Sequence, residues 1–163
     1  MRKRYVAALA TTVLAIAGGV IFAPSALADP PTIQTFPITA TSFDTTDCAF
    51  PVQIDIVGTD LEITSAAGDR IFDAFPDSRA TLTNLDTARS ITVSIAGPGH
   101  TILGADGSFT LVGTGPTLFW LAPRLFPGIT LFNGRFVLSF DAQGNRTFTH
   151  VGETQDLCAE LAG

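Results

Sequence analysis

The chain has few residues of the types on which catalysis or metal binding usually depends. Its 163 residues include two cysteines, two histidines and one tryptophan. The motifs G-x-S-x-G and H-E-x-x-H are absent, and the two histidines do not stand at a metal-binding spacing. We therefore interpret His100 and His150 as a solvated loop residue and a partly buried spacer. The sequence predicts no catalytic residue, no metal site and no cofactor.

Basic side chains are also scarce. Lys3 is the only lysine, and beyond residue 28 six arginines stand against fifteen acidic residues, a net charge of about −9. This balance repels a phosphate backbone, so we expect no nucleic-acid partner. Twelve of the fifteen acids are aspartate, a residue that favours turns over helices.

The chain begins with the pattern of an export signal. Basic residues 2–4 precede an apolar run over 6–22, and Ala26-Leu27-Ala28 is a small-x-small cleavage signature. The alternative is that the run stays as a membrane anchor, which the small-residue site disfavours. We expect a cleaved signal peptide over 1–28 and one secreted or envelope-associated domain over 29–163. That domain is expected to be a monomer with no membrane span.

Cys48 and Cys158 stand near the two ends of this domain. In an exported chain an even pair of cysteines indicates a disulfide, which here would close a loop of about 110 residues and contribute about 4 kcal/mol. Metal-binding or redox thiols are the alternative. The chain has no C-x-x-C motif and no histidine near either cysteine, which favours the disulfide.

Short segments of alternating polar and apolar residues fill most of the domain. The clearest strands lie at residues 52–56, 80–85 and 90–96. Further strand candidates lie at 33–43, 61–64, 70–75, 100–103, 108–112 and 117–121, and one helical turn is expected at 155–161. Glycine-containing breaks are expected at 58–60, at 97–99 and at 113–116. Eight to ten short strands without helical periodicity predict an all-β antiparallel sandwich, with a closed β-barrel as the alternative.

Residues 129–151 carry the strongest local signals. Asn133-Gly134 predicts a two-residue hairpin turn that would place Leu131 opposite Phe136, so the segment is expected to form three strands.

A second turn follows Asp141. With three loop residues it would place Phe148 and His150 on the face of Phe136, whereas two would point Thr147 inward. The larger free energy gained by burying Phe148 favours three.

Two pairs of nearby acids were weighed as candidate acid–base or Ca²⁺ sites. They are Asp44 with Asp47 and Asp73 with Asp77. Both pairs lie beside turn signals, where aspartate side chains accept hydrogen bonds from their own backbone. We therefore expect turn chemistry at both.

Residues 118–126, LFWLAPRLF, are the most suggestive of function. Alternation along a strand cannot bury all of their large apolar side chains, so they would form a contact patch for a lipid, a glycan or a protein. The alternative, which we favour, is that they cap the core. The candidate ligand-binding residues are Phe119, Trp120, Arg124 and Phe126, together with His100.

Three segments, 95–100, 106–115 and 156–161, together resemble a group of small secreted actinobacterial proteins of unassigned function. Those proteins have a signal peptide, two distant cysteines and a Ser-Gly-Pro-Gly-His-like motif, which here reads Ala96-Gly97-Pro98-Gly99-His100. The likeness covers most of residues 48–163. It implies export and a β fold, and it supplies no catalytic residues.

Three functions follow as hypotheses. The first is an exported non-enzymatic β-sandwich that binds an apolar or glycan ligand or an envelope partner. The second is a small hydrolase that uses His100 or His150 with a nearby aspartate, and a histidine within about 3.2 Å of a serine or aspartate would favour it. The third is a structural role in the envelope through an open sheet edge.

Overall fold

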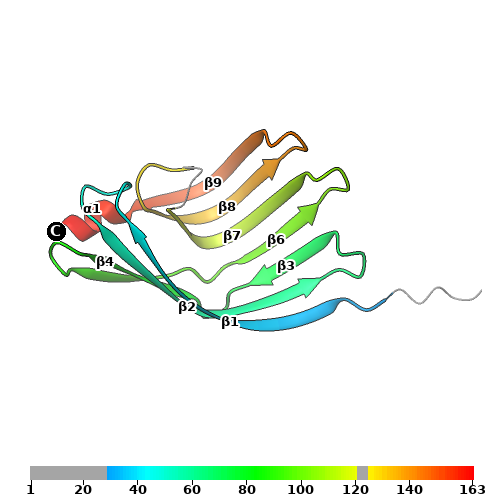
Figure 1. Ribbon diagram of the computed structural model, residues 1–163, viewed down its shortest axis with the longest axis horizontal. Coiled ribbons are helices and arrows are strands. Elements are labelled where there is room, and N and C mark those ends of the chain that lie inside the picture. The colour runs from blue at the N-terminus through cyan, green and yellow to red at the C-terminus, as the bar shows by residue number, and fades with distance from the viewer. Residues whose placement is uncertain (1–28, 121–124) are drawn as a thin grey trace, which may run out of the picture.

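The structure is a computed structural model that describes residues 29–120 and 125–163 (Figure 1). The strands are β1 (Thr32–Asp44), β2 (Val52–Thr64), β3 (Arg70–Ala74), β4 (Arg79–Asn84), β5 (Ser90–Ser94), β6 (Pro98–Leu103), β7 (Phe109–Phe119), β8 (Thr130–Phe140) and β9 (Arg146–Asp156), followed by helix α1 (Leu157–Ala162). All pairs of neighbouring strands are antiparallel. The prediction of an all-β antiparallel domain with eight to ten strands is confirmed.

The strands form one open, curved sheet. Its order is β5-β4-β2-β3-β6-β7-β8-β9, with β1 on the other edge of β2, and Figure 1 shows β1 and β9 at opposite ends of the curve. The alternative of a closed barrel is therefore wrong. The first half of β2 pairs with β4 and the second half with β3, so the sheet divides at β2. This division brings the β2–β4–β5 part opposite the ends of β7 and β8.

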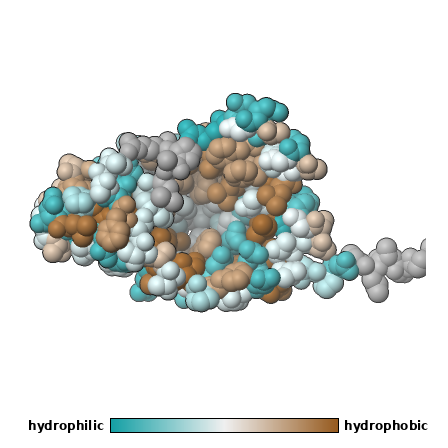
Figure 2. All heavy atoms as spheres, viewed as in Figure 1, coloured by the Kyte–Doolittle hydropathy of each residue, from teal (hydrophilic) through white to brown (hydrophobic). Residues whose placement is uncertain are grey.

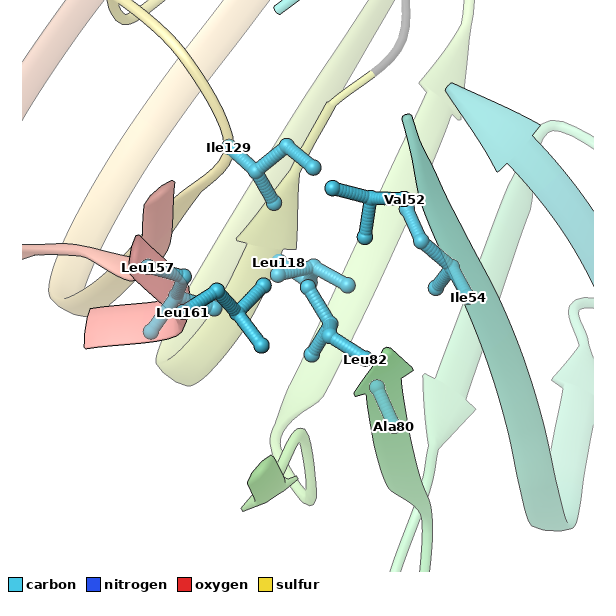
Figure 3. Close-up of a cluster of buried hydrophobic side chains, with 8 residues drawn as sticks. All are labelled: Val52, Ile54, Ala80, Leu82, Leu118, Ile129, Leu157 and Leu161. Carbon is cyan, nitrogen blue, oxygen red and sulfur yellow. The ribbon is translucent and has the colours of Figure 1, made fainter. Parts of the chain in front are cut away.

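The hydrophobic core lies between these two parts of the sheet (Figure 3). Its buried side chains are Val52, Ile54, Ala80, Leu82, Leu118, Ile129, Leu157 and Leu161. Leu157 and Leu161 lie one turn apart on α1, and the helix therefore closes the core. The Asp156 carboxylate caps α1 by accepting from the backbone N–H groups of the second and third residues after it. Within the described residues no helix is long and apolar enough to cross a membrane.

The predicted disulfide is present. Cys48, between β1 and β2, is bonded to Cys158 on α1, and their Cα atoms lie 5.4 Å apart across a sequence separation of 110. Both cysteines pack against the core. The bond therefore ties the N-terminal and C-terminal regions of the domain together, and it fixes the helix that closes the core.

The predicted hairpin at Asn133-Gly134 is wrong, because β8 runs straight through these residues. Gly134 pairs with Gly115 of β7 on one side and with Gly152 of β9 on the other. A Cβ at Gly134 would lie 2.3 Å from the backbone oxygen of Val151. The strands approach too closely here for a side chain, and a row of glycines across strands lets a sheet curve. The segment therefore forms two strands and one turn.

The other expected glycine breaks also lie wholly or partly inside strands. β2 is continuous through Gly58, where a Cβ would lie 2.2 Å from the Oγ of Ser78, which packs against that position. The segment 97–99 was expected to be irregular, yet β6 begins at its proline. β7 likewise runs through Gly113 and Gly115. In these strands glycine permits close packing and does not end the strand.

The turn after Asp141 has the three loop residues that were predicted. The Asp141 N–H donates to the carbonyl of Asn145, and its carboxylate accepts from backbone N–H groups of the loop. The resulting register places His150 opposite Phe136 and puts Phe148 on the same face. The rings of Phe136 and Phe148 lie 6.3 Å apart, and Phe148 is half-buried, as expected.

Candidate functional site

The concave side of the sheet holds a cavity of about 380 Å³. Figure 2 shows this side hollowed, with hydrophobic residues gathered over the strands around the hollow. The apolar walls include Ile38, Ile56, Phe75, Ile95, Leu111 and Phe136. These residues come from β1, β2, β7, β8 and the connections beside β3 and β5, so the cavity exists only once the sheet has curved. A mostly apolar cavity of this size with a few polar groups is typical of small-molecule sites.

Two polar groups at the cavity lack a hydrogen-bond partner among the described residues. They are the Oγ of Ser78 and the indole Nε1 of Trp120, and both residues line the cavity. Ser78 is only 1% exposed. A buried polar group without a partner costs about 1–3 kcal/mol. A bound molecule that offers an acceptor atom to either group would offset that cost.

A carboxyl group also faces the cavity. Asp73 lines it from β3, directly opposite Glu62 of β2, and Asp60 lies two residues before Glu62 on the same face. Burial raises the pKa of Asp73, and the charges of Asp60 and Glu62 raise it further. Burial and then Glu62 also raise the pKa of Asp60. Across the part of the chain that the structure describes, no three His, Cys, Asp or Glu side chains are grouped so that they could hold a metal ion.

Phe119 and Phe126, two of the predicted ligand-binding residues, meet in an aromatic cluster, with ring centroids 5.1 Å apart. The aromatic cluster consists of Phe119, Phe126, Phe132, Phe136, Phe148 and His150. Phe136 belongs to both the aromatic cluster and the cavity wall. The two predicted residues are half-buried against other rings. For Phe119 and Phe126 this arrangement agrees with the interpretation that they cap the core and not with an exposed patch, while residues 121–124 lie outside the described residues.

The described ones among the remaining predicted residues, Trp120 and His100, do not lie in one site. Trp120 lines the cavity, and Arg124 lies outside the described residues. His100 pairs with Phe72, one residue before Asp73, and strand alternation therefore places it on the outer face of the sheet. There it borders a separate small hollow.

Among the described residues neither histidine makes the hydrogen bond that was set as the sign of a general base. Within the described residues no hydrogen bond joins His100 or His150 to a serine or an aspartate. His150 instead stacks on Phe148 with ring centroids 5.3 Å apart. The geometry that would favour a hydrolase is therefore not found in this part of the chain.

The prediction of turn chemistry has a different outcome for the two pairs of acids. The Asp44 carboxylate accepts from the backbone N–H groups of the second and third residues after it, so turn chemistry is confirmed there. The prediction is wrong for the other pair, because Asp77 accepts from the backbone and hydroxyl of Thr59, and Asp73 lines the cavity. The sequence feature that could have identified Asp73 is its position inside a predicted strand. A strand buries a charged side chain only where a partner or a ligand compensates the charge.

No protein-family model, no curated protein and no solved structure matches the chain. The cavity must therefore be interpreted from its own geometry, which supplies apolar walls, two unpaired polar groups and one carboxyl group. Such a set of groups can hold and orient a molecule.

Proposed function

We propose that this chain is an exported, non-enzymatic binding protein that holds a small, largely apolar molecule in the cavity of its concave face. The observation that carries the proposal is the cavity of about 380 Å³, with the unpaired polar groups of Ser78 and Trp120 at its wall. Protein interiors are normally close-packed and satisfy their buried polar groups. A bound molecule would supply the missing contacts.

Further observations support export and binding. Residues 1–28 have the pattern of a signal peptide, and a disulfide persists mainly in oxidising compartments. The resemblance to small secreted actinobacterial proteins points the same way. The position of His100 on the outer face, and the packing of His150 against Phe148, favour binding over hydrolysis.

The walls favour an apolar ligand over a glycan. Sugars are bound through many hydrogen bonds to their hydroxyl groups, whereas the polar side chains at this cavity are few: Asp73, Ser78, Thr117 and Trp120. Burying apolar ligand surface contributes about 25 cal/mol per Å². The main source of affinity here is therefore the hydrophobic effect, with the polar groups setting the orientation.

Trp120 fluorescence tests the proposal. Trp120 is the only tryptophan, and the only tyrosine, Tyr5, lies in the signal segment, so emission from the mature domain reports on the cavity. We expect the uncharged apolar probe N-phenyl-1-naphthylamine to bind saturably at one site and to quench Trp120 by energy transfer. An unsaturable or absent probe signal, with unchanged Trp120 emission, would contradict the proposal.

A matched pair of variants locates the binding. A Cβ at Gly99 has only the backbone oxygen of Val112 within 4 Å, at 3.4 Å, so Gly99→Val fits the strand and fills part of the cavity. His100→Val adds the same residue at the next position on the outer face. Probe binding should be lost in the first variant and kept in the second, while both keep the melting temperature of the native domain within a few degrees. Equal binding of the probe by both variants would show that the probe binds outside the cavity.

A further inference from the structure

We infer, on the basis of the proposed function, that the cavity prefers an apolar amine, whose ammonium group meets Asp73, over an alcohol or a carboxylate of the same chain length. The inference concerns the class of ligand, and it depends on the distribution of charge around the cavity.

Three carboxyl groups stand on the concave face, and none of the described residues that line the cavity carries a basic side chain. Asp73 and Glu62 are cross-strand partners, and Asp60 shares their face, since it lies at even spacing from the cavity-lining Ile56. One carboxylate oxygen of Asp60 is buried and has no hydrogen-bond partner among the described residues. Like charges that are close and partly desolvated repel one another. Burial, and after it this repulsion, raises the pKa values of Asp60 and Asp73.

The arginines of β3, β4 and β8 are directed away from this face. Among the described residues that line the cavity, none is arginine, lysine or histidine. Arg70 lies two residues before Phe72 on the outer face, and Arg79 pairs with the outward-facing Val57. Arg135 precedes Phe136, which faces the cavity, so it points to the other side. Among the described residues the cavity therefore holds no positive charge to pair with Asp73, and a cationic ligand would supply one.

Ser78 provides an independent reason to expect a polar ligand group at this site. Its hydroxyl is buried and has no partner among the described residues, and Ser78 lines the same cavity as Asp73. A hydroxyl oxygen accepts as well as donates, so it can receive a hydrogen bond from an ammonium group. A carboxylate ligand would instead bring a fourth negative charge to the three acids.

Displacement of N-phenyl-1-naphthylamine by three ligands of one chain length tests the inference. Decylamine, decan-1-ol and decanoate are titrated at pH 7.5 below their micellar concentrations, where the first is a cation and the last an anion. Because hydrogen bonds to charged groups contribute about 1.5–3 kcal/mol, decylamine should bind at least about tenfold more tightly than decanoate, with decan-1-ol between them.

Two variants, each of which removes one negative charge, distinguish the effect of Asp73 itself from the effect of the net charge of the domain. Asp73→Asn should bring the affinities for decylamine and decan-1-ol within about twofold of each other, since the ammonium group loses its charged partner. Asp55→Asn, on the outer face of β2, should keep the preference. An equal loss in both variants would attribute the preference to net charge and overturn the inference.

The other outcomes are also distinguishable. Equal or tighter binding of decanoate, or failure of all three ligands to displace a probe that does bind, overturns the inference and leaves the proposed function standing. If the probe itself does not bind to the native domain, the proposed function fails.

Discussion

Removal of the bond between Cys48 and Cys158 should be among the most destabilising changes in this domain. The bond closes a sequence separation of 110 residues. In the chain-entropy model, a loop of that length removes about 16 cal/mol/K from the unfolded chain, or about 4.8 kcal/mol at 25 °C. A domain of about 135 residues unfolds with an entropy of about 0.28 kcal/mol/K, so the melting temperature should fall by about 15–20 °C.

Thermal unfolding followed by circular dichroism measures this effect in the double variant Cys48→Ala/Cys158→Ala. The native domain in the presence of a reducing agent is the matched control. The reduced native domain should melt at the same temperature as the double variant. The reducing agent should not lower the melting temperature of the double variant further. A fall of less than about 5 °C in the double variant would refute the reasoning, because it would mean that the bond constrains the unfolded chain far less than its loop length requires.

Three further predictions concern stability. Gly58→Ala should lower the free energy of unfolding by about 1–3 kcal/mol, because the added Cβ would lie 2.5 Å from the Cα of Ser78; urea denaturation measures this change. Leu161→Ala removes a fully buried side chain from the core and should cost about 2–5 kcal/mol in the same assay. Because the pKa of Asp73 is raised in the folded domain, its ionised form is unfavourable, and Asp73→Asn should melt at a higher temperature than the native domain at pH 7. That difference should disappear as the pH falls through the raised pKa toward the ordinary value of 3.8.

Matched controls make these predictions specific. Gly99→Ala adds a methyl group where the nearest atom is 3.4 Å away, and Val151→Ala changes a side chain that is 80% exposed. Both should alter stability by less than about 0.5–1 kcal/mol. Losses as large as those of Gly58→Ala and Leu161→Ala would contradict the packing described. If acidification does not raise the melting temperature of the native domain relative to that of Asp73→Asn, the result would contradict the assigned direction of the Asp73 pKa.

Strands could be predicted from the sequence where alternation is uninterrupted, as at residues 52–56. The ends of the strands could not be predicted, because glycine in a sequence indicates a turn even where the strand continues through it. At Gly58 and Gly134 the requirement for glycine comes from residues distant in sequence, Ser78 and Val151, which occupy the space of a side chain. Only the paired sheet reveals such a requirement, and the predicted breaks at these positions were therefore wrong.

The candidate site was predictable only in part. Trp120 could be identified because it is the only tryptophan and lies in a segment too apolar to be wholly buried by alternation. Asp73 and Ser78 could not be identified from the sequence. Strand pairing brings Asp73 to the cavity, Ser78 lies in a connection between strands, and both are far from Trp120 in sequence. The outward position of His100 depends on its pairing with Phe72, and a shift of one residue in that register would have turned it inward.

The indole N–H signal of Trp120 tests the central claim most directly. A ¹⁵N-labelled mature domain has one tryptophan and so gives one indole cross-peak. On titration with decan-1-ol, that signal should move downfield to saturation, because the unpaired N–H gains the ligand oxygen as an acceptor. An indole signal that stays fixed, with no shifts or with shifts confined to the outer face around His100, would contradict ligand binding in the cavity.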